Sequence, residues 1–269
     1  MADPSGPKRT AAVLGRPIEH SLSPVLHRAG YAALGLAWDY TAIDCGPAEL
    51  AGVLAEHSDY AGFSATMPLK YELLQVAASV SEVAVAIGAA NTLLPTAAGW
   101  RAENTDWIGI RDALAAAGVP AAGDVLVLGA GGTAQAALAA LITANSITAA
   151  VRDPGRARGL LAAGERLGLV VRLVSLADLP AADLVISTLP PGAADPVAVP
   201  AAPAVLDVVY AGWPTALARR AAGTGAVVVS GAAMLLYQAA RQFELMTGRA
   251  APVAAMQAAM RAAVPAGGL

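Results

Sequence analysis

A lysine in the first half of the chain has the setting of an acid–base catalyst. Lys70 ends the segment Thr66-Met67-Pro68-Leu69-Lys70, which follows an apolar run at residues 60–65. Pro68 favours an extended Met67 and a first helical turn after it, so the sequence predicts a helix from Pro68 with Lys70 in its first turn. A helix N-terminus disfavours a cation, so we expect the ammonium to exchange its proton readily. A solvated surface lysine is the alternative interpretation.

Three polar residues lie between a predicted short strand at 99–103 and a predicted helix at 107–117. They are Asn104, Thr105 and Asp106. The Asp106 carboxylate is expected to face a cleft between two domains, where it could pair with Lys70 and direct proton transfer. The alternative is a helix N-cap, a position that all three residue types favour. A cap uses only one of the three, so the other two need another role.

Two serines near the N-terminus are spaced to share a side of the chain. In the extended segment Ser21-Leu22-Ser23-Pro24, a two-residue spacing points both hydroxyls the same way, which suits a carboxylate or polyhydroxylated ligand. Ser23 could instead be the N-cap of a helix that starts at Pro24. His20 and His27 have no third residue arranged as a metal ligand, so we expect packing histidines and no metal site.

A glycine-rich turn in the second half has the setting of a dinucleotide-binding loop. Gly129-Ala130-Gly131-Gly132-Thr133-Ala134 follows an apolar run at 125–128 and precedes an Ala-rich segment, which predicts a strand, a turn and a helix. Gly129 permits the tight turn, Gly131 lets the backbone approach a pyrophosphate, and Ala134 lets the helix pack on the strand. The amides of the helix N-terminus would hold the phosphates.

Two arginines follow the next predicted strand of this half. Arg152 stands where an arginine would hold the 2′-phosphate of NADP, and Arg156 lies four residues later, on or near the same helical face. Two guanidinium groups can clamp a phosphate. Asp153, however, lies near the spacing at which an acidic residue binds the ribose of NAD. The sequence favours NADP and leaves NAD open.

Met234 and Gln238 lie four residues apart, on one face of the helix predicted after Gly231. A methionine on such a helix is usually part of the core. A glutamine on the same apolar face needs a polar partner, which a bound substrate would supply.

The predicted elements form an α/β protein of two domains. In the C-terminal half, apolar runs at 125–128, 147–151, 169–173, 183–187, 204–209 and 226–229 alternate with helices, which predicts a Rossmann-type parallel sheet. Ligands of such sheets bind beyond the carboxyl ends of the strands, near Gly129, Arg152, Thr188, Tyr210 and Gly231. We predict a substrate-binding domain at 1–106 and a dinucleotide-binding domain at 107–231, with helices within 232–269 packing back towards the first. The active site would lie in the cleft between the domains.

Composition narrows the class of protein. The chain has 269 residues, enough for two domains, and its net charge of −3 gives no reason to expect nucleic acid. Although 57% of the residues are hydrophobic, no apolar run reaches the roughly 18 to 20 residues that a membrane span needs. Cys45 has no second cysteine to pair with and is expected to be a packed thiol. The polar segment 1–10 lacks the apolar core of a signal peptide, so we expect a soluble cytoplasmic protein.

Taken in order, several segments resemble the motifs of the shikimate dehydrogenases. They are Gly15-Arg16-Pro17-Ile18-Glu19-His20-Ser21-Leu22-Ser23-Pro24, Thr66 to Lys70, Gly88-Ala89-Ala90-Asn91-Thr92, Asn104 to Asp106, Gly129 to Gly132, Asp207-Val208-Val209-Tyr210, and Gly231-Ala232-Ala233-Met234-Leu235 with Gln238-Ala239. The resemblance spans nearly the whole chain. It implies an NADP-dependent enzyme that reduces 3-dehydroshikimate reversibly to shikimate, a step towards chorismate and the aromatic amino acids.

The resemblance also implies a role for each residue. Lys70 would be the acid/base and Asp106 its partner. Ser21 and Ser23 would bind the substrate carboxylate, Thr66, Asn91, Asp106 and Gln238 its hydroxyls, and Tyr210 would add a further contact. The cofactor would lie against Gly129, Ala130, Gly131, Gly132, Thr133, Ala134, Arg152, Asp153, Arg156, Thr188 and Val208, with Gly231 and Met234 bordering the nicotinamide. The turn departs from the family at Gln135, where an arginine is usual, which removes one potential phosphate contact.

Three other functions stay open from the sequence. The nearest is a quinate or quinate/shikimate dehydrogenase that uses NAD. A folate-type methylene dehydrogenase also pairs a lysine-bearing domain with a dinucleotide domain, but the Ser-x-Ser-Pro and Asn-Thr-Asp segments argue against it. A non-catalytic, nucleotide-responsive binding protein would have no use for an acid/base pair. The sequence shows no heptads and no clear exposed apolar face, so a homodimer stays open.

Overall fold

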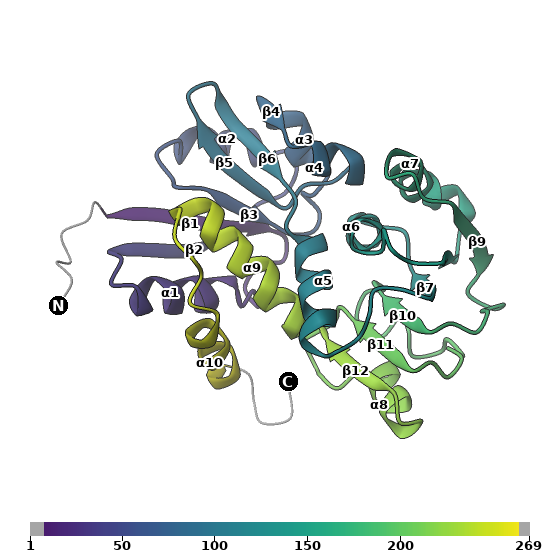
Figure 1. Cartoon of the computed structure of the whole chain (residues 1–269). Helices are drawn as coiled ribbons and strands as arrows, with labels where there is room; N and C mark the ends of the chain where they lie inside the picture. The colour runs from purple at the N-terminus through teal and green to yellow at the C-terminus, as the bar shows by residue number, and fades with distance from the viewer. Residues whose placement is uncertain (1–7, 264–269) are drawn as a thin grey trace. The chain divides into compact units, whose positions relative to one another are not determined.

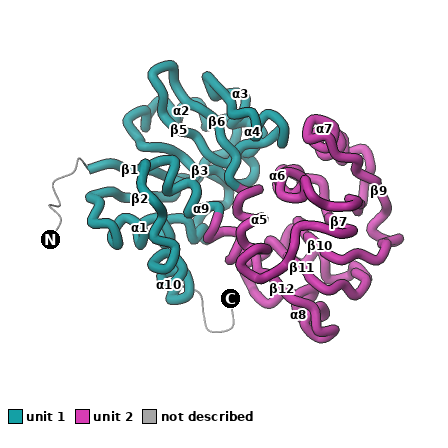
Figure 2. Tube along the Cα trace, viewed as in Figure 1, with its two compact units in different colours: residues 1–105, 238–264 teal, residues 106–237, 265–269 magenta. Residues whose placement is uncertain are grey.

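The computed structural model describes residues 8–263, and their contacts divide them into two compact units (Figure 2). Unit 1 contains residues 8–105 and 238–263, and unit 2 contains residues 106–237. The first boundary lies one residue before the predicted one, and the second lies six residues after it. Residues 1–7 and 264–269, which belong to the predicted domains, lie outside the described residues.

Unit 1 is built on a mixed sheet of six strands in the order β2-β1-β3-β5-β6-β4 (Figure 1). The strands are β1 (Arg9–Gly15), β2 (Trp38–Asp44), β3 (Phe63–Ala65), β4 (Ser79–Val80), β5 (Thr92–Thr96) and β6 (Gly99–Glu103). β1 is parallel to β2 and β3, whereas β5 is antiparallel to both β3 and β6. The ends of β1, β3 and β6 and the start of β5 therefore meet at one edge of the sheet, and the predicted substrate residues follow or precede these strands.

The helices of unit 1 are α1 (Ser23–Ala33), α2 (Leu50–Glu56), α3 (Glu72–Val76), α4 (Glu82–Ile87), the later part of α9 (Gly231–Thr247) and α10 (Val253–Ala263). The helix predicted from Pro68 does not form there, because residues 67–71 are in a turn, and the short strand β4 separates α3 from α4. Leu14, Phe63, Leu69 and Leu93 are among the fully buried side chains of the cluster that joins α2, α3 and α4 to the sheet.

Unit 2 is built on six strands that are all parallel, in the order β12-β11-β10-β7-β8-β9. The strands are β7 (Asp124–Leu128), β8 (Ser146–Val151), β9 (Val171–Ser175), β10 (Leu184–Ser187), β11 (Ala204–Asp207) and β12 (Val227–Ser230). This confirms the predicted Rossmann-type sheet. Its central strands read as unbroken apolar runs because both of their faces are buried.

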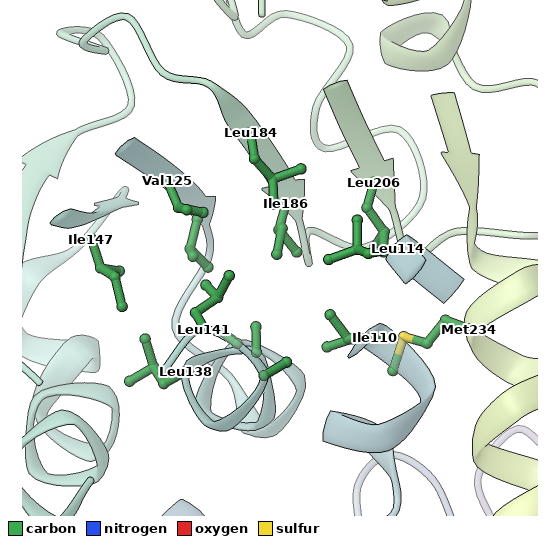
Figure 3. Packing of buried hydrophobic residues seen from close by; sticks show 14 of the residues in the cluster. Ile110, Leu114, Val125, Leu138, Leu141, Ile147, Leu184, Ile186, Leu206 and Met234 are labelled. Atoms are coloured by element: carbon green, nitrogen blue, oxygen red, sulfur yellow. The ribbon is translucent and has the colours of Figure 1, made fainter. Parts of the chain in front are cut away.

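Helices pack on both faces of this sheet. They are α5 (Asp106–Ala116), α6 (Gly132–Ala140), the 3-10 helix η1 (Pro154–Ala157) with α7 (Arg158–Arg166), and α8 (Ala216–Gly223), which the sequence analysis missed. On one face, Val125, Ile186 and Leu206 point towards Leu138 of α6 and Ile110 of α5 (Figure 3). Each such fully buried side chain stabilises the fold by about 1.5–3 kcal/mol.

The alternate residues of the same strands face the other way. Leu126, Val185 and Val205 pack with Leu217 and Ala221 of α8 in a second cluster.

The longest helix of residues 8–263, α9, has 17 residues. No helix in this part of the chain combines the length and apolar character needed to cross a membrane.

Candidate functional site

The loops after β1 and β3 bring Thr66 against the end of β1. The Thr66 amide donates to the Leu14 carbonyl at 2.9 Å, and the Arg16 amide donates to the Met67 carbonyl at 3.1 Å. A Cβ at Gly15 would lie 2.5 Å from the Thr66 methyl group, so only glycine lets the two loops approach this closely. Thr66 itself is half-buried at this sheet edge.

Lys70 lies in a turn that precedes α3. Its backbone carbonyl accepts a hydrogen bond from the Ala90 amide at 2.8 Å, and its side chain is half-buried. The Met67–Pro68 peptide is cis. The predicted helix start at Pro68 was wrong, because α3 begins at Glu72 and has five residues. The helix-dipole argument for Lys70 loses its basis, since the lysine precedes a very short helix.

A buried polar network joins Asn91, Thr105 and Gln238 within unit 1. The Asn91 Nδ2 group donates to Thr105 Oγ1 at 3.0 Å and to Gln238 Oε1 at 3.2 Å, while Asn91 Oδ1 accepts from the Thr105 amide at 2.8 Å. All three side chains are less than a tenth exposed. The sequence correctly indicated that Gln238 needs a polar partner, but the protein itself supplies one.

The segment Asn104 to Asp106 divides its roles between the two units. The Asn104 side-chain Nδ2 group donates to the Ala89 carbonyl oxygen at 2.8 Å, and Thr105 joins the network with Asn91. Asp106 opens α5, where a carboxylate is favoured by the helix dipole, and it is buried. All three residues therefore have an identifiable place, and the pairing of Asp106 with Lys70 stays a prediction.

The two serines are arranged differently from the prediction. Leu22 has helical backbone angles, φ −85° and ψ −2°, so the segment is not extended. Ser23 is the first residue of α1 and not its N-cap, and its amide donates to the Ser21 hydroxyl at 3.3 Å. Ser21 thus supports the start of the helix, while Ser23 is buried.

His27 is a packing residue, as predicted. Its ring stacks on Tyr40 with centroids 4.0 Å apart, and it is fully buried. Within the described residues, neither ring nitrogen forms a hydrogen bond of normal geometry, although the Gln242 side chain lies close enough to affect the ring. Burial lowers the pKa of His27 to about 3, because the charged form would lose its hydration. The prediction that His20 also packs was wrong, because His20 is exposed. The Cys45 thiol is buried, as predicted.

The glycine turn of unit 2 has the predicted strand–turn–helix geometry. Gly129 has a φ of +106°, and a Cβ there would lie 2.5 Å from the Thr188 hydroxyl. A Cβ at Gly131 would meet no atom within 4 Å, so the space beside Gly131 is open. Gly131 is also the N-cap of α6, with no side-chain hydrogen bond to the helix start. This arrangement can receive a phosphate at the α6 amides.

Gln135 and Ala134 lie inside unit 2. Ala134 is fully buried, as expected for a small residue between helix and strand. Gln135 is buried as well, and a Cβ at Gly159 would lie 2.5 Å from its Nε2 atom, so Gln135 lies directly against Gly159 of α7. Gln135 is thus a packing residue between α6 and α7.

Arg152, Asp153 and Arg156 surround the end of β8. Asp153 Oδ1 accepts from the Gly155 amide at 2.9 Å and caps η1, so this carboxylate has a local structural role. Arg152 precedes η1 and Arg156 lies within it, so the two do not share one regular helical face as predicted. Both are exposed, and neither forms an ion pair with another residue in 8–263.

The loop after β11 is held by a buried aspartate. Asp207 Oδ2 accepts from the Thr215 hydroxyl at 2.7 Å, and Oδ1 accepts from the Val209 amide at 3.3 Å. Burial raises the pKa of the Asp207 carboxyl and, further along the loop, that of the half-buried Tyr210. Val208 directly follows Asp207 in the sequence and is half-buried.

Gly231 and Met234 begin α9. A Cβ at Gly231 would lie 2.0 Å from the Val208 carbonyl oxygen, so the helix start touches the β11 loop backbone to backbone. Met234 packs in the core with Ile110, which confirms the interpretation of a core methionine (Figure 3).

Sequence reasoning missed three residues of this arrangement: Thr92, Thr215 and Gln242. Thr92 and Gln242 extend the network of Asn91, and Thr215 both caps α8 and bonds to Asp207. The four-residue spacing of Gln238 and Gln242 on one helix was an available signal for the second glutamine.

Comparisons with known proteins identify the family of this chain. Residues 13–93 match the profile of the shikimate dehydrogenase substrate binding domain, and residues 231–261 match that of the shikimate 5′-dehydrogenase C-terminal domain. The shikimate dehydrogenase (NADP(+)) of Moorella thermoacetica is 38% identical over 94% of this chain and 92% of its own length.

Solved structures of shikimate dehydrogenases are similar to this chain in both sequence and fold. Shikimate dehydrogenase of Mycobacterium tuberculosis has 43% identity and a TM-score of 0.88, covering 95% of this chain and all of that one. The Thermus thermophilus shikimate 5-dehydrogenase, solved with NADP(H) and shikimate, has 36% identity and a TM-score of 0.85, over 95% and 100% of the two chains. The chain belongs to the shikimate dehydrogenase family.

Proposed function

We propose that this chain is an NADP-dependent shikimate dehydrogenase that reduces 3-dehydroshikimate reversibly to shikimate, in the route to chorismate and the aromatic amino acids. One observation carries the proposal: the chain aligns over 95% of its length with a structure that holds both NADP(H) and shikimate. The open glycine turn and the buried amide network supply sites of the right chemistry in this chain.

The cofactor site that we propose lies at the carboxyl edge of the parallel sheet in unit 2. The α6 amides at Gly132 and Thr133 would hold the pyrophosphate, because this helix start carries no side-chain cap. Arg152 and Arg156 are exposed and would hold the 2′-phosphate of NADP. The use of Asp153 as a cap supports NADP over NAD, since its carboxylate already binds the Gly155 amide.

The substrate site that we propose lies at the edge of the unit 1 sheet where Thr66 and Asn91 meet. Asn91, Gln238 and Thr66 would hold the ring hydroxyls with Asp106, while Ser21 and Ser23 would hold the carboxylate. Tyr210 would add a contact from the loop that Asp207 holds. When bound, NADPH supplies the hydride that reduces the C3 ketone.

We propose that Lys70 transfers the proton in this reaction. During reduction, the Lys70 ammonium would donate a proton to the oxygen at C3, and during oxidation the neutral amine would take it back. Asp106 would orient the ammonium and offset its charge. Half-burial of Lys70 would limit the competition of water for that proton.

A matrix of two substrates and two cofactors tests the proposal. Shikimate and quinate are each offered with NADP+ and NAD+, and nicotinamide absorbance follows turnover. We expect oxidation of shikimate with NADP+ to give the highest kcat/KM. Turnover of quinate with NAD+ alone would instead establish the alternative dehydrogenase, and nucleotide binding without turnover would establish a binding protein.

We further propose a cytoplasmic enzyme, which is supported by the charged, water-soluble character of its substrate and cofactor. Light scattering tests for a homodimer: one chain has a mass of 26.7 kDa, and a dimer would have twice that mass.

A further inference from the structure

A second glutamine of α9 contacts the same segment that Gln238 contacts. Gln242 lies one helical turn after Gln238, and its Nε2 group donates to the Asn91 carbonyl oxygen at 3.3 Å and to Thr92 Oγ1 at 3.1 Å. Gln242, Thr92 and Asn91 are each no more than 1% exposed. These contacts lie within unit 1 and are therefore defined by one compact body.

The donors and acceptors of this group permit one orientation. A backbone carbonyl can only accept, so the part of Gln242 that faces the Asn91 carbonyl must be its NH2 group. Because the same NH2 group also donates to Thr92 Oγ1, the Thr92 hydroxyl is free to donate its own hydrogen elsewhere. That hydrogen points to Asn91 Oδ1, which lies 2.9 Å away.

These hydrogen bonds also determine how the side-chain amides of Asn91 and Gln238 are oriented in the proposed substrate site. Asn91 Oδ1 receives the Thr92 hydroxyl and the Thr105 amide, so Asn91 Nδ2 is turned towards Gln238 Oε1. The Gln238 oxygen is thereby fixed as an acceptor, and its NH2 group is directed away from Asn91. Two amides that could each flip by 180° are held in one state.

We propose that Gln242 is a positioning residue of the substrate site, which acts through Thr92 to fix the amide orientations of Asn91 and Gln238. The inference rests on the proposed function, because it assumes that these two amides bind the substrate. Because a buried polar group without a partner is costly, the two bonds that the Gln242 NH2 group donates hold this side chain in place.

The first test replaces Gln242 by methionine, which keeps the length and helix propensity but removes the donors. We expect the KM for shikimate to rise about five- to tenfold, as for loss of one buried hydrogen bond, with the KM for NADP+ unchanged. Gln257→Met is the matched control, because Gln257 lies on α10 and has no hydrogen bond to Asn91 or Thr92. It should keep wild-type values of both KM.

The second test acts on the intermediate residue and does not depend on the stability of Gln242→Met. Thr92→Val removes the hydroxyl and keeps the shape, whereas Thr92→Ser keeps the hydroxyl. We expect Thr92→Val to raise the KM for shikimate like Gln242→Met, Thr92→Ser to restore it, and the double variant Thr92→Val/Gln242→Met to add little further. Additive effects, or an unchanged KM in a folded Gln242→Met or Thr92→Val protein, would overturn the proposal. If wild-type protein turned over no shikimate, the proposed function would fail instead.

Discussion

At the residue scale, proton transfer at the proposed site depends on Lys70. The chain has 17 basic residues, of which two, Lys8 and Lys70, are lysines and the other 15 are arginines. An arginine stays protonated in proteins, whereas a lysine can give up its proton. Lys70, four residues after Thr66, is therefore the lysine that is placed for acid–base work.

Replacing Lys70 separates proton transfer from charge. We expect both Lys70→Ala and Lys70→Arg to lower kcat by about 10² to 10⁴, with a modest change in the KM for shikimate. Lys8→Arg is the control and should keep wild-type kcat, because Lys8 is exposed before β1. Steady-state kinetics with NADP+ provide the measurement. Full activity of Lys70→Arg would mean that the site needs only a positive charge.

The buried His27 should make stability depend on pH. Its pKa is lowered to about 3 in the folded chain, against about 6.5 when unfolded, so the unfolded chain binds the extra proton between these values. The contribution of His27 to the free energy of unfolding is fully present above pH 6.5. As the pH falls towards 3, this contribution decreases by up to about 1.4 kcal/mol per pH unit. His27→Phe should keep the ring stacking on Tyr40 and remove this slope.

Urea unfolding of wild type and His27→Phe at several pH values between 4 and 7.5 provides the measurement. Equal slopes in the two proteins would show that His27 does not carry the effect.

At the element scale, the sequence predicted what local patterns determine. The Val125 to Leu128 strand and its glycine turn were predictable, because continuous apolar residues followed by Gly129 specify a buried strand and a turn with positive φ. The structure after Pro68 was not predictable, because residues 67–71 form a turn and the two-residue strand β4 that follows α3 exists only through pairing with β6.

In the candidate site too, residue types could be predicted from the sequence, whereas contacts between distant residues could not. The residue types at Asn91 and Gln238 were recognisable, but their contact joins positions 147 residues apart and follows from the docking of α9. Asp153 looked like a ribose ligand in sequence, and only the backbone of η1 reveals its use as a cap.

The junction of β12 and α9 has no room for a side chain at Gly231. Gly231→Ala would bring a Cβ to 2.0 Å from the Val208 carbonyl oxygen, and both groups belong to main chain that cannot rotate away. We expect the free energy of unfolding of unit 2 to fall by about 1–3 kcal/mol, as in overpacked cores, with weaker NADP+ binding.

Gly223→Ala is the matched control. Gly223 is the last residue of α8, and a Cβ there would meet nothing within 4 Å, so this variant should be as stable as wild type or slightly more stable. Denaturant unfolding compares the two variants. Equal stability of Gly231→Ala and Gly223→Ala would mean that the β11 loop can yield.

At the scale of the whole molecule, two units with separate sheets share one chain. Each has its own buried core, so ligands can stabilise them separately. Trp38 and Trp100 belong to unit 1, whereas Trp107 and Trp213 belong to unit 2. The four tryptophans therefore divide evenly as reporters of the two units.

Selective tryptophan variants can assign each ligand to a unit. In Trp38→Phe/Trp100→Phe, fluorescence reports unit 2, and we expect NADP+ at 100 times its Kd to stabilise this transition by about 2.7 kcal/mol. In Trp107→Phe/Trp213→Phe, fluorescence reports unit 1, and shikimate should give the larger shift. Identical shifts with both ligands in both variants would show that the units unfold as a single cooperative body.

The division of unit 1 into two stretches of sequence bears on how the protein is made. Residues 8–105 leave the ribosome well before Phe243, whose ring lies against Gly30 and Tyr31 and fills the space beside α1. At synthesis rates of about 5–20 residues per second, the 132 residues of 106–237 take roughly 7 to 26 s to appear. During that interval unit 2 can fold, while the nascent unit 1 exposes the apolar surface that α9 and α10 later cover. Helices α9 and α10, which follow most of unit 2 in the chain, thus complete unit 1, and the interval before they emerge is when a chaperone would be most needed.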